Sequence, residues 1–154
     1  MNKSSFEAEL AEKGRIIYPN VGVSMRPLIK QGRDVMVIEK PTGRLKRYDG
    51  ALYVRKDGSY VMHRVLKVRE NDYVICGDNC IRKEYGITDD QIIGKLTAVL
   101  RNGKEIKSTD LGYRIYVHIW CDLFYLRIAV LWGIRIVRAV FRRIGRLFGI
   151  KRNK

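Results

Sequence analysis

Residues 51–68 read ALYVRKDGSYVMHRVLKV, two runs rich in β-branched and aromatic residues on either side of Asp57-Gly58. An Asp-Gly pair between two such runs is typical of a tight hairpin turn. The stretch therefore predicts two antiparallel strands, at 51–55 and 59–68. His63 lies inside the second strand.

Further strand-like runs occur at short intervals on both sides of this hairpin, at 15–18, 35–39, 72–76, 92–100 and 104–106. Asn102-Gly103 is a second typical hairpin turn, and Asn71-Asp72 is a third candidate. Short strands joined by hairpins indicate a mainly β, antiparallel domain. Ahead of it, residues 4–14 have a capping serine, early acids and a terminal glycine, which predict a short N-terminal helix.

The charge of the chain divides it into two parts. The formal net charge of the 154 residues is +15. Residues 111–154 contribute +9 of this, with Asp122 as their single acid, whereas residues 1–110 contribute +6. We therefore predict a β domain over 1–110 and a strongly basic tail over 111–154.

The tail has the pattern of a basic amphipathic helix. Five arginines fall within an arc of roughly 100° on a helical wheel, and most apolar residues lie elsewhere on it; the arginines are Arg127, Arg135, Arg138, Arg142 and Arg146. The longest charge-free runs have seven residues, 115–121 and 128–134, whereas a membrane span needs about 20 apolar residues. We expect peripheral association with a membrane surface, with Trp120, Trp132 and Phe141 near the headgroups. The alternative is a helix docked on the β domain or on another subunit.

A candidate nucleophile lies in residues 21–28, VGVSMRPL. Ser24 sits between Gly22 and Pro27, on a backbone that is neither helix nor regular strand, so its hydroxyl can project from a turn. A neutral imidazole can remove the proton of a serine hydroxyl at physiological pH. His63 is the candidate base. Asp34, which follows the serine stretch, is expected to fix the turn.

Three short motifs in this order resemble those of a known family. Residues 22–28 resemble the G/S-x-S-M-x-P-x-[LFM] box of type I signal peptidases and the related LexA-like self-cleaving peptidases. His63-Arg64-Val65 resembles the H-R-V box of the branch that uses histidine where most bacterial signal peptidases use lysine, and Gly77-Asp78-Asn79 resembles the family's G-D-N box. The resemblance covers about residues 20–100. It implies a coiled, antiparallel, β-barrel-like fold and a serine endopeptidase that cleaves leader or signal peptides without metal or cofactor.

The resemblance also implies roles for single residues. Ser24 would be the nucleophile, His63 the general base and Asp78 a member of the site. The backbone of Gly22, Ser24 and Met25 would border the oxyanion and the substrate. Relatives carry a further aspartate beyond the G-D-N box, but residues 81–84 read IRKE here. The remaining candidates for a third catalytic group are Glu84, Asp89 and Asp90.

Several other site types are not expected. Cys76, Cys80 and Cys121 form no C-x-x-C pattern, so we predict free thiols in or near the core and no zinc site. Lys46 and Lys56 lie in a polar connection and a hairpin turn, where lysine stays charged and makes a poor base. Residues 1–14 are polar and mixed in charge, which predicts neither a signal peptide nor an N-terminal anchor.

Two alternatives to a leader peptidase remain. A self-cleaving LexA-like peptidase usually carries a DNA-binding region, and the roughly 20 residues before Ser24 are too few for one. The other alternative is a non-catalytic protein that binds membranes or nucleic acid through its net charge. Nucleic acid is not the expected partner, because the β domain has no aromatic-basic platform of the RNA-binding type. The sequence makes no prediction about the oligomeric state.

Overall fold

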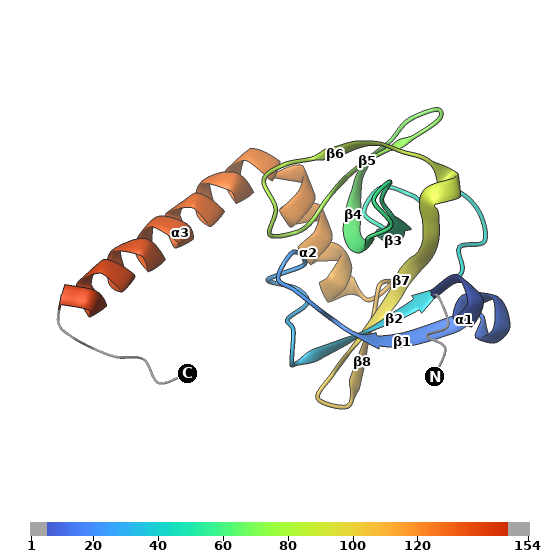
Figure 1. The fold of residues 1–154 in the computed structure, drawn as a ribbon, viewed down its shortest axis with the longest axis horizontal. Helices are drawn as coiled ribbons and strands as arrows, with labels where there is room; N and C mark the ends of the chain where they lie inside the picture. The colour runs from blue at the N-terminus through green and yellow to red at the C-terminus, as the bar shows by residue number, and fades with distance from the viewer. Residues whose placement is uncertain (1–5, 148–154) are drawn as a thin grey trace.

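A computed structural model describes residues 6–147 of the chain (Figure 1). The predicted capping residues Ser4 and Ser5 and the last part of the predicted tail, 148–154, lie outside the described range. The elements are, in order, α1 (Phe6–Lys13), β1 (Arg15–Pro19), β2 (Asp34–Glu39), β3 (Gly50–Val54), β4 (Tyr60–Val68), β5 (Tyr73–Cys76), β6 (Glu84–Ile87), the 3₁₀ turn η1 (Asp89–Gln91), β7 (Ile92–Arg101), β8 (Lys104–Lys107), α2 (Leu111–Asp122) and α3 (Phe124–Leu147).

The strands form one antiparallel sheet, which confirms the predicted mainly β class. Their order is β1-β2-β7-β3-β4-β5-β6, with β8 beside β7. The predicted hairpin at 51–68 is present, with Tyr53 opposite Val61 and Gly58 at φ +80° in its turn. The Asn102-Gly103 hairpin joins β7 to β8. Within residues 6–147 no backbone pairing joins β1 to β6, so the strand pairing does not show the closed barrel that the resemblance implies.

One strand, β6, is not predicted by the sequence pattern. It has only four residues, and Gly86 at φ +72° interrupts it. Such a short segment has no alternation of apolar and polar residues to reveal it. The strand is nevertheless important, because it carries Glu84 to the edge of the site.

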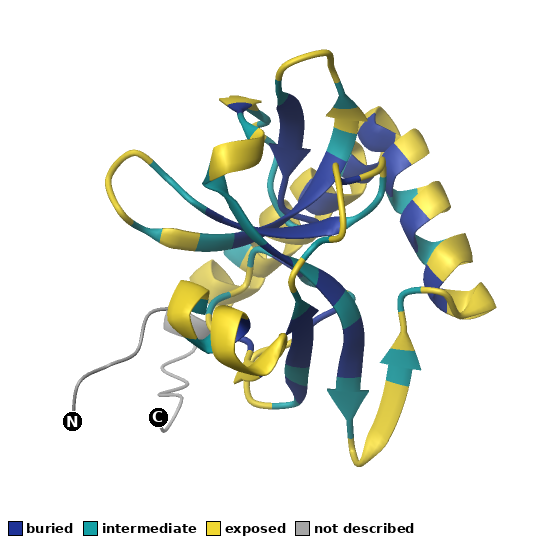
Figure 2. Ribbon diagram, turned by 90° about the vertical axis from the view of Figure 1, so that its right-hand side faces the viewer, coloured by how far each residue is buried: buried dark blue, intermediate teal, exposed yellow. Residues whose placement is uncertain are grey.

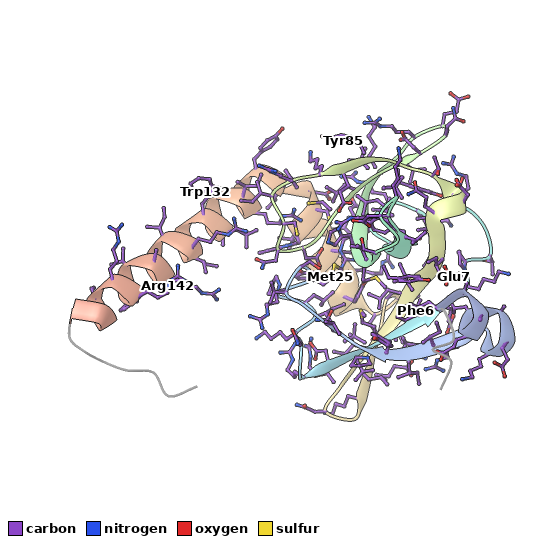
Figure 3. The ribbon with its side chains drawn as sticks, in the orientation of Figure 1. Phe6, Glu7, Met25, Tyr85, Trp132 and Arg142 are labelled. Atoms are coloured by element: carbon purple, nitrogen blue, oxygen red, sulfur yellow. The ribbon has the colours of Figure 1, made fainter. Side chains whose placement is uncertain are left out.

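The core anchors the loop between β1 and β2, residues 20–33, which we call the serine loop. The inner strands are buried over most of their length, β5 along all of it and β3 except at its last residue, whereas exposed residues gather in the turns and on the helices (Figure 2). Met25, next to Ser24, is 1% exposed and packs with Ile29, Met36 and Leu52 in one of two core clusters (Figure 3). Burying a methionine side chain stabilises a fold by about 1.5–3 kcal/mol. The serine loop is therefore held to the domain by an apolar side chain next to the serine.

The predicted tail forms two helices that break at Leu123. The first, α2, buries Tyr113, Val117 and Cys121 against the β domain, as the docked alternative expected. The second, α3, extends away from the body of the molecule (Figure 1). None of the helices in residues 6–147 combines the length and the apolar character that a membrane crossing requires.

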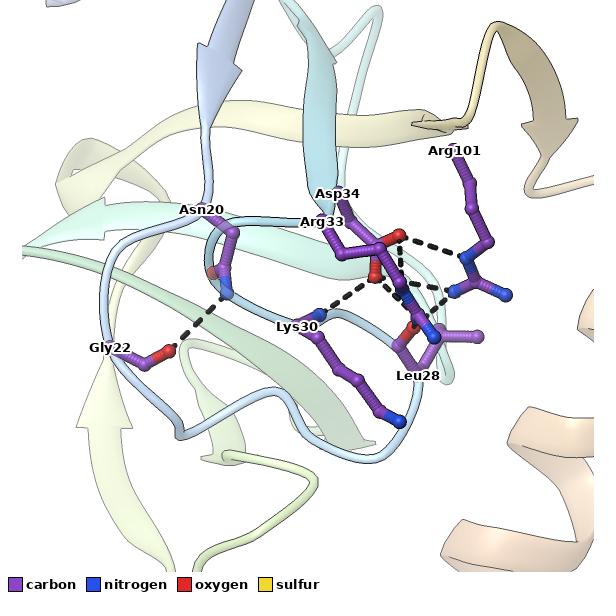
Figure 4. Close-up of polar contacts among 7 residues, drawn as sticks. All are labelled: Asn20, Gly22, Leu28, Lys30, Arg33, Asp34 and Arg101. Carbon is purple, nitrogen blue, oxygen red and sulfur yellow. Dashed lines mark hydrogen bonds and ion pairs between the residues drawn. The ribbon is translucent and has the colours of Figure 1, made fainter. Parts of the chain in front are cut away.

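Asp34 fixes the end of the serine loop, as predicted (Figure 4). Its buried carboxylate accepts hydrogen bonds from Arg33 Nε and Arg101 Nε at 2.8 Å each, and from the Lys30 amide at 2.7 Å. Both guanidinium groups also donate to the Leu28 carbonyl. Burial alone would raise the pKa of Asp34, but these hydrogen bonds outweigh it and hold the pKa well below its usual range.

We expect Asp34→Asn to lower the free energy of unfolding at pH 7 by about 3 kcal/mol, because it leaves two guanidinium groups facing a neutral amide. Folding lowers the pKa of this carboxyl, so its ionised form stabilises the folded state at pH values above the unfolded pKa of about 3.9. This contribution is lost as the pH falls toward the folded pKa. The difference in the free energy of unfolding between wild type and variant should therefore become smaller below about pH 4. Urea denaturation at pH 7 and pH 3 measures both quantities.

The exposed Asp90 provides the control. Asp90→Asn should leave stability within about 0.5 kcal/mol of wild type at both pH values. An Asp34→Asn variant as stable as wild type at pH 7 would contradict this account of the loop.

Candidate active site

A cavity of about 570 Å³ opens between the serine loop, α1 and strands β2 to β4. Ser24 and His63 both line it. The rest of the lining is largely apolar: Phe6, Tyr18, Val21, Met36, Ile38, Leu52, Tyr60, Val61 and Met62, with Asn20, Arg55 and Cys80. The two residues that the sequence pairs as nucleophile and base therefore meet at one apolar cavity.

Ser24 lies half-buried in a turn, with its backbone held by the loop that follows β5. The Asn79 amide donates a hydrogen bond to the Ser24 carbonyl at 2.7 Å. Within residues 6–147, the amides of Ser24 and Met25 donate no hydrogen bond to another residue. The Gly22 amide, by contrast, donates to Gln31 Oε1 at 3.0 Å, and Gly22 has a φ of +90°. Of the three predicted backbone positions, Ser24 and Met25 keep a free N–H for a substrate oxygen.

Gly77 lies where the serine loop and His63 approach each other. A Cβ at this position would lie 2.8 Å from the Ser24 carbonyl oxygen and 2.9 Å from His63 Nε2. Only glycine fits between two groups this close. His63 Nε2 and the backbone of Ser24 are thus separated by little more than one glycine.

The carboxylate that contacts His63 belongs to Glu84. Glu84 Oε1 lies 2.9 Å from His63 Nδ1, and the Tyr53 hydroxyl lies 3.3 Å from the same nitrogen. Arg55 binds the Glu84 carboxylate through two hydrogen bonds, of 2.6 and 2.8 Å. A carboxylate on Nδ1 assigns the proton to that nitrogen and leaves Nε2 as the acceptor that faces the serine loop.

The carboxylate of the predicted site residue Asp78 pairs with Arg64 rather than with His63. Its carboxylate forms two hydrogen bonds with Arg64, of 2.8 and 2.9 Å, and neither side chain is exposed to solvent. The Tyr116 hydroxyl donates to the same carboxylate at 3.1 Å. His63 and Arg64 are consecutive on β4 and therefore point to opposite faces of the sheet. Asp78 lies on the Arg64 face, so Glu84 takes the position beside the imidazole.

The electrostatics of the site favour a neutral imidazole. Burial lowers the pKa of His63 below its ordinary value, and the attraction of Glu84 only partly opposes this. Burial alone would raise the pKa of Glu84, but hydrogen bonds from Arg55 and Tyr53 outweigh it and lower the pKa. Near neutral pH, the site therefore holds an ionised carboxylate next to an imidazole that can accept a proton.

The C-terminal helices support the loop that holds Ser24. Three consecutive carbonyls of this loop accept hydrogen bonds from them: Asp78 O from Trp120 Nε1 at 2.7 Å, Asn79 O from Arg135 Nη2 at 3.4 Å, and Cys80 O from Arg127 Nη2 at 2.9 Å. No sequence pattern predicts these contacts, because they join segments about 40 to 60 residues apart. The two helices thus contribute to the support of the site.

The other candidates lie away from this arrangement. Asp89 pairs with Arg44 and accepts a hydrogen bond from Tyr73, while Asp90 is exposed. Lys46 and Lys56 are exposed and do not line the cavity. The three cysteines are free thiols, two of them buried, as predicted.

No protein-family model matches the chain, and no curated protein or solved structure is significantly similar to it. Its function is therefore inferred from the chemistry of the cavity. In residues 6–147, no group of three or more His, Cys, Asp or Glu side chains is arranged to hold a metal ion. The groups that line the cavity suit proton transfer between a hydroxyl and an imidazole.

The protonation of His63 predicts a pH profile for the reactivity of Ser24. Because burial lowers the pKa of His63, the acid limb of the reaction with a serine-directed inhibitor should lie below pH 6.5. Glu84→Gln should move this limb to still lower pH, since the charge of Glu84 raises the pKa of His63. It should also slow the reaction by about 100-fold at neutral pH, because the imidazole loses its orienting carboxylate.

The matched control is Asp90→Asn, which removes an exposed carboxylate that does not contact His63. Its profile should coincide with that of wild type. If Glu84→Gln has the wild-type rate and acid limb, Glu84 does not orient the imidazole.

Proposed function

We propose that this chain is a serine endopeptidase of the signal peptidase type, with Ser24 as nucleophile, His63 as general base and Glu84 as the carboxylate that orients His63. The observation that carries the proposal is the position of the Ser24 carbonyl oxygen and of His63 Nε2 on either side of Gly77, at a cavity that both residues line, with Nδ1 held by Glu84. The same constellation of hydroxyl, imidazole and carboxylate activates serine on unrelated folds. Geometry and roles, rather than overall similarity, support this assignment.

In the proposed reaction, Ser24 Oγ attacks the carbonyl carbon of the scissile peptide bond while His63 Nε2 takes its proton. The oxyanion that forms accepts hydrogen bonds from the free amides of Ser24 and Met25. The protonated His63 then gives its proton to the leaving amine, and the C–N bond breaks. A water molecule, deprotonated by His63, attacks the resulting ester. The bond between the acyl carbon and Ser24 Oγ then breaks, and His63 gives its proton to Ser24 Oγ.

The proposed substrate is a leader or signal segment bound in extended form, with small side chains near the cut. The edge strand β1 supports this, because among residues 6–147 it pairs with β2 alone and most of its residues are exposed. Tyr18 of β1 lines the cavity. An extended peptide that adds to this edge would use the free backbone groups of β1 and reach Ser24. The proposal also includes the coiled, β-barrel-like sheet that the resemblance to signal peptidases implies.

The proposal includes peripheral contact of α3 with a membrane surface. Trp132 and Phe141 of α3 are 57% and 69% exposed, and they lie among other exposed apolar residues: Leu126, Val130, Ile134, Ile136, Val137, Val140 and Ile144. An exposed apolar helix face next to arginines suits the boundary between lipid headgroups and acyl chains. Such contact would keep the catalytic cavity near membrane-bound substrates.

Covalent labelling tests the proposed nucleophile. A serine-directed inhibitor that acylates or phosphonylates the hydroxyl should modify the wild-type protein at Ser24. Ser24→Ala and His63→Ala should remain unmodified, because the first lacks the nucleophile and the second lacks the base. Mass spectrometry of the intact protein and of its peptides gives the extent and position of labelling.

Ser59→Ala is the control, because Ser59 is a hairpin serine that bonds Asp57. It should be labelled as wild type is. An unlabelled wild-type protein, or equal labelling of Ser24→Ala, would refute the peptidase function. Incubation with preproteins, and with leader peptides encoded beside the gene, then tests the substrate class.

A further inference from the structure

A second cavity, of about 600 Å³, lies between α3 and the serine loop. Its lining includes Arg26, Lys30 and Arg33 from the loop and Arg135 and Arg138 from α3, and no aspartate or glutamate. We call this cavity the basic cleft. The catalytic function proposed above does not use it.

Most of the positive charge in the basic cleft is not neutralised by carboxylates in the described part of the chain. Of its five cations, only Arg33 forms an ion pair with a carboxylate in residues 6–147, that of Asp34. Arg135 donates only to the Asn79 carbonyl, and Arg26 Nε is buried with no hydrogen-bond partner among the described residues. Unpaired cations that converge on one cavity create a positive potential that favours an anionic occupant.

The arginine arc of α3 faces the body of the molecule. Arg127 and Leu131 belong to this arc, and they are 2% and 5% exposed because they pack against the domain. Arg135 and Arg138, further along the same arc, therefore line the basic cleft. The exposed apolar residues occupy the rest of the helix surface. The arginines that line the basic cleft thus face the domain. The apolar arc of α3 faces outward, which is the arc that an interfacial helix presents to the bilayer.

The basic cleft adjoins the catalytic serine. Val23 and Pro27 line it, on either side of Ser24 and Met25 in the sequence. Asn79 lines it as well, and the Asn79 amide holds the Ser24 carbonyl. An extended chain advances about 3.3 Å per residue. A substrate bound at Ser24 therefore needs only a few residues to reach the cleft.

We infer that the basic cleft binds an acidic stretch of the peptide substrate, a few residues from the scissile bond. Carboxylates of the substrate would pair with Arg26, Lys30 and Arg138, none of which forms an ion pair with a carboxylate of residues 6–147. This inference rests on the proposed peptidase function. It further specifies that the substrate is negatively charged near the cut. The cleft would select leaders with acidic residues on one side of the cut.

Binding can be measured without catalysis in the Ser24→Ala protein. The probes are two fluorescent peptides of glycine, serine and alanine, one with four consecutive glutamates and the other with glutamines in their place. By fluorescence anisotropy, the glutamate peptide should bind at least about tenfold more tightly than the glutamine peptide. Adding Lys30→Gln and Arg138→Gln, one from each wall of the cleft, should weaken binding of the glutamate peptide by about tenfold.

Lys104→Gln with Lys107→Gln is the charge-matched control, because both lysines are exposed on β8 and absent from the lining of the cleft. This pair should change the affinity by less than about twofold. All four substituted side chains are exposed, and circular dichroism verifies that each variant is folded. Equal losses in the two double variants would mean that only net charge matters, which overturns the inference.

Vesicles of phosphatidylcholine, with and without phosphatidylglycerol, test a lipid headgroup as the occupant. If Lys30→Gln with Arg138→Gln abolishes binding to the anionic vesicles but leaves peptide binding intact, the cleft is a headgroup site and the inference is wrong.

The outcomes for the two proposals are separable. Failure of inhibitor labelling with intact, cleft-dependent peptide binding refutes the peptidase function alone. Successful labelling with peptide binding indifferent to the cleft refutes this inference alone.

Discussion

The candidate site depends on the ion pair between Arg64 and Asp78, which is completely buried. A buried ion pair stabilises a fold only when its geometry and its remaining hydrogen bonds offset the loss of hydration. Arg64 meets this condition, because it makes two hydrogen bonds to Asp78 and one each to the Tyr48 carbonyl and the Tyr113 hydroxyl. The pair ties β4 to the loop after β5. His63 precedes Arg64 and Gly77 precedes Asp78, so the pair also fixes His63 against the glycine that separates it from the serine loop.

The same loop joins the C-terminal helices to Ser24, the proposed nucleophile. Arg135 of α3 donates to the Asn79 carbonyl, and the Asn79 amide donates to the Ser24 carbonyl. Trp120 of α2 holds the adjacent carbonyl of Asp78. These contacts make the basic tail part of the support of the site. They also explain how α3 can form one wall of a cleft beside Ser24 while most of its apolar residues remain exposed.

Much of the fold is predictable from the sequence because its signals are local. The Asp57-Gly58 turn and the strand patterns beside it specify the β3–β4 hairpin, and the turn residues around Ser24 indicate an irregular backbone. The partner of His63 is not predictable in this way. Glu84 lies on a four-residue strand without a periodic pattern, and it approaches His63 through pairing between strands distant in sequence. Asp78 was the preferred candidate because it matches a motif, but its carboxylate pairs with Arg64, which points to the other face of β4 from His63.

The central claim is that the side chain at position 24 lies within proton-transfer distance of His63. The most direct test replaces Ser24 by cysteine and measures the pH dependence of its alkylation by iodoacetamide, with the modified peptide identified by mass spectrometry. A thiol beside an imidazole forms a thiolate–imidazolium pair, so its pKa should fall clearly below the ordinary value of about 8.5. Adding His63→Ala should return the pKa to that value or above it. The same alkylation profile with and without His63 would contradict the claim.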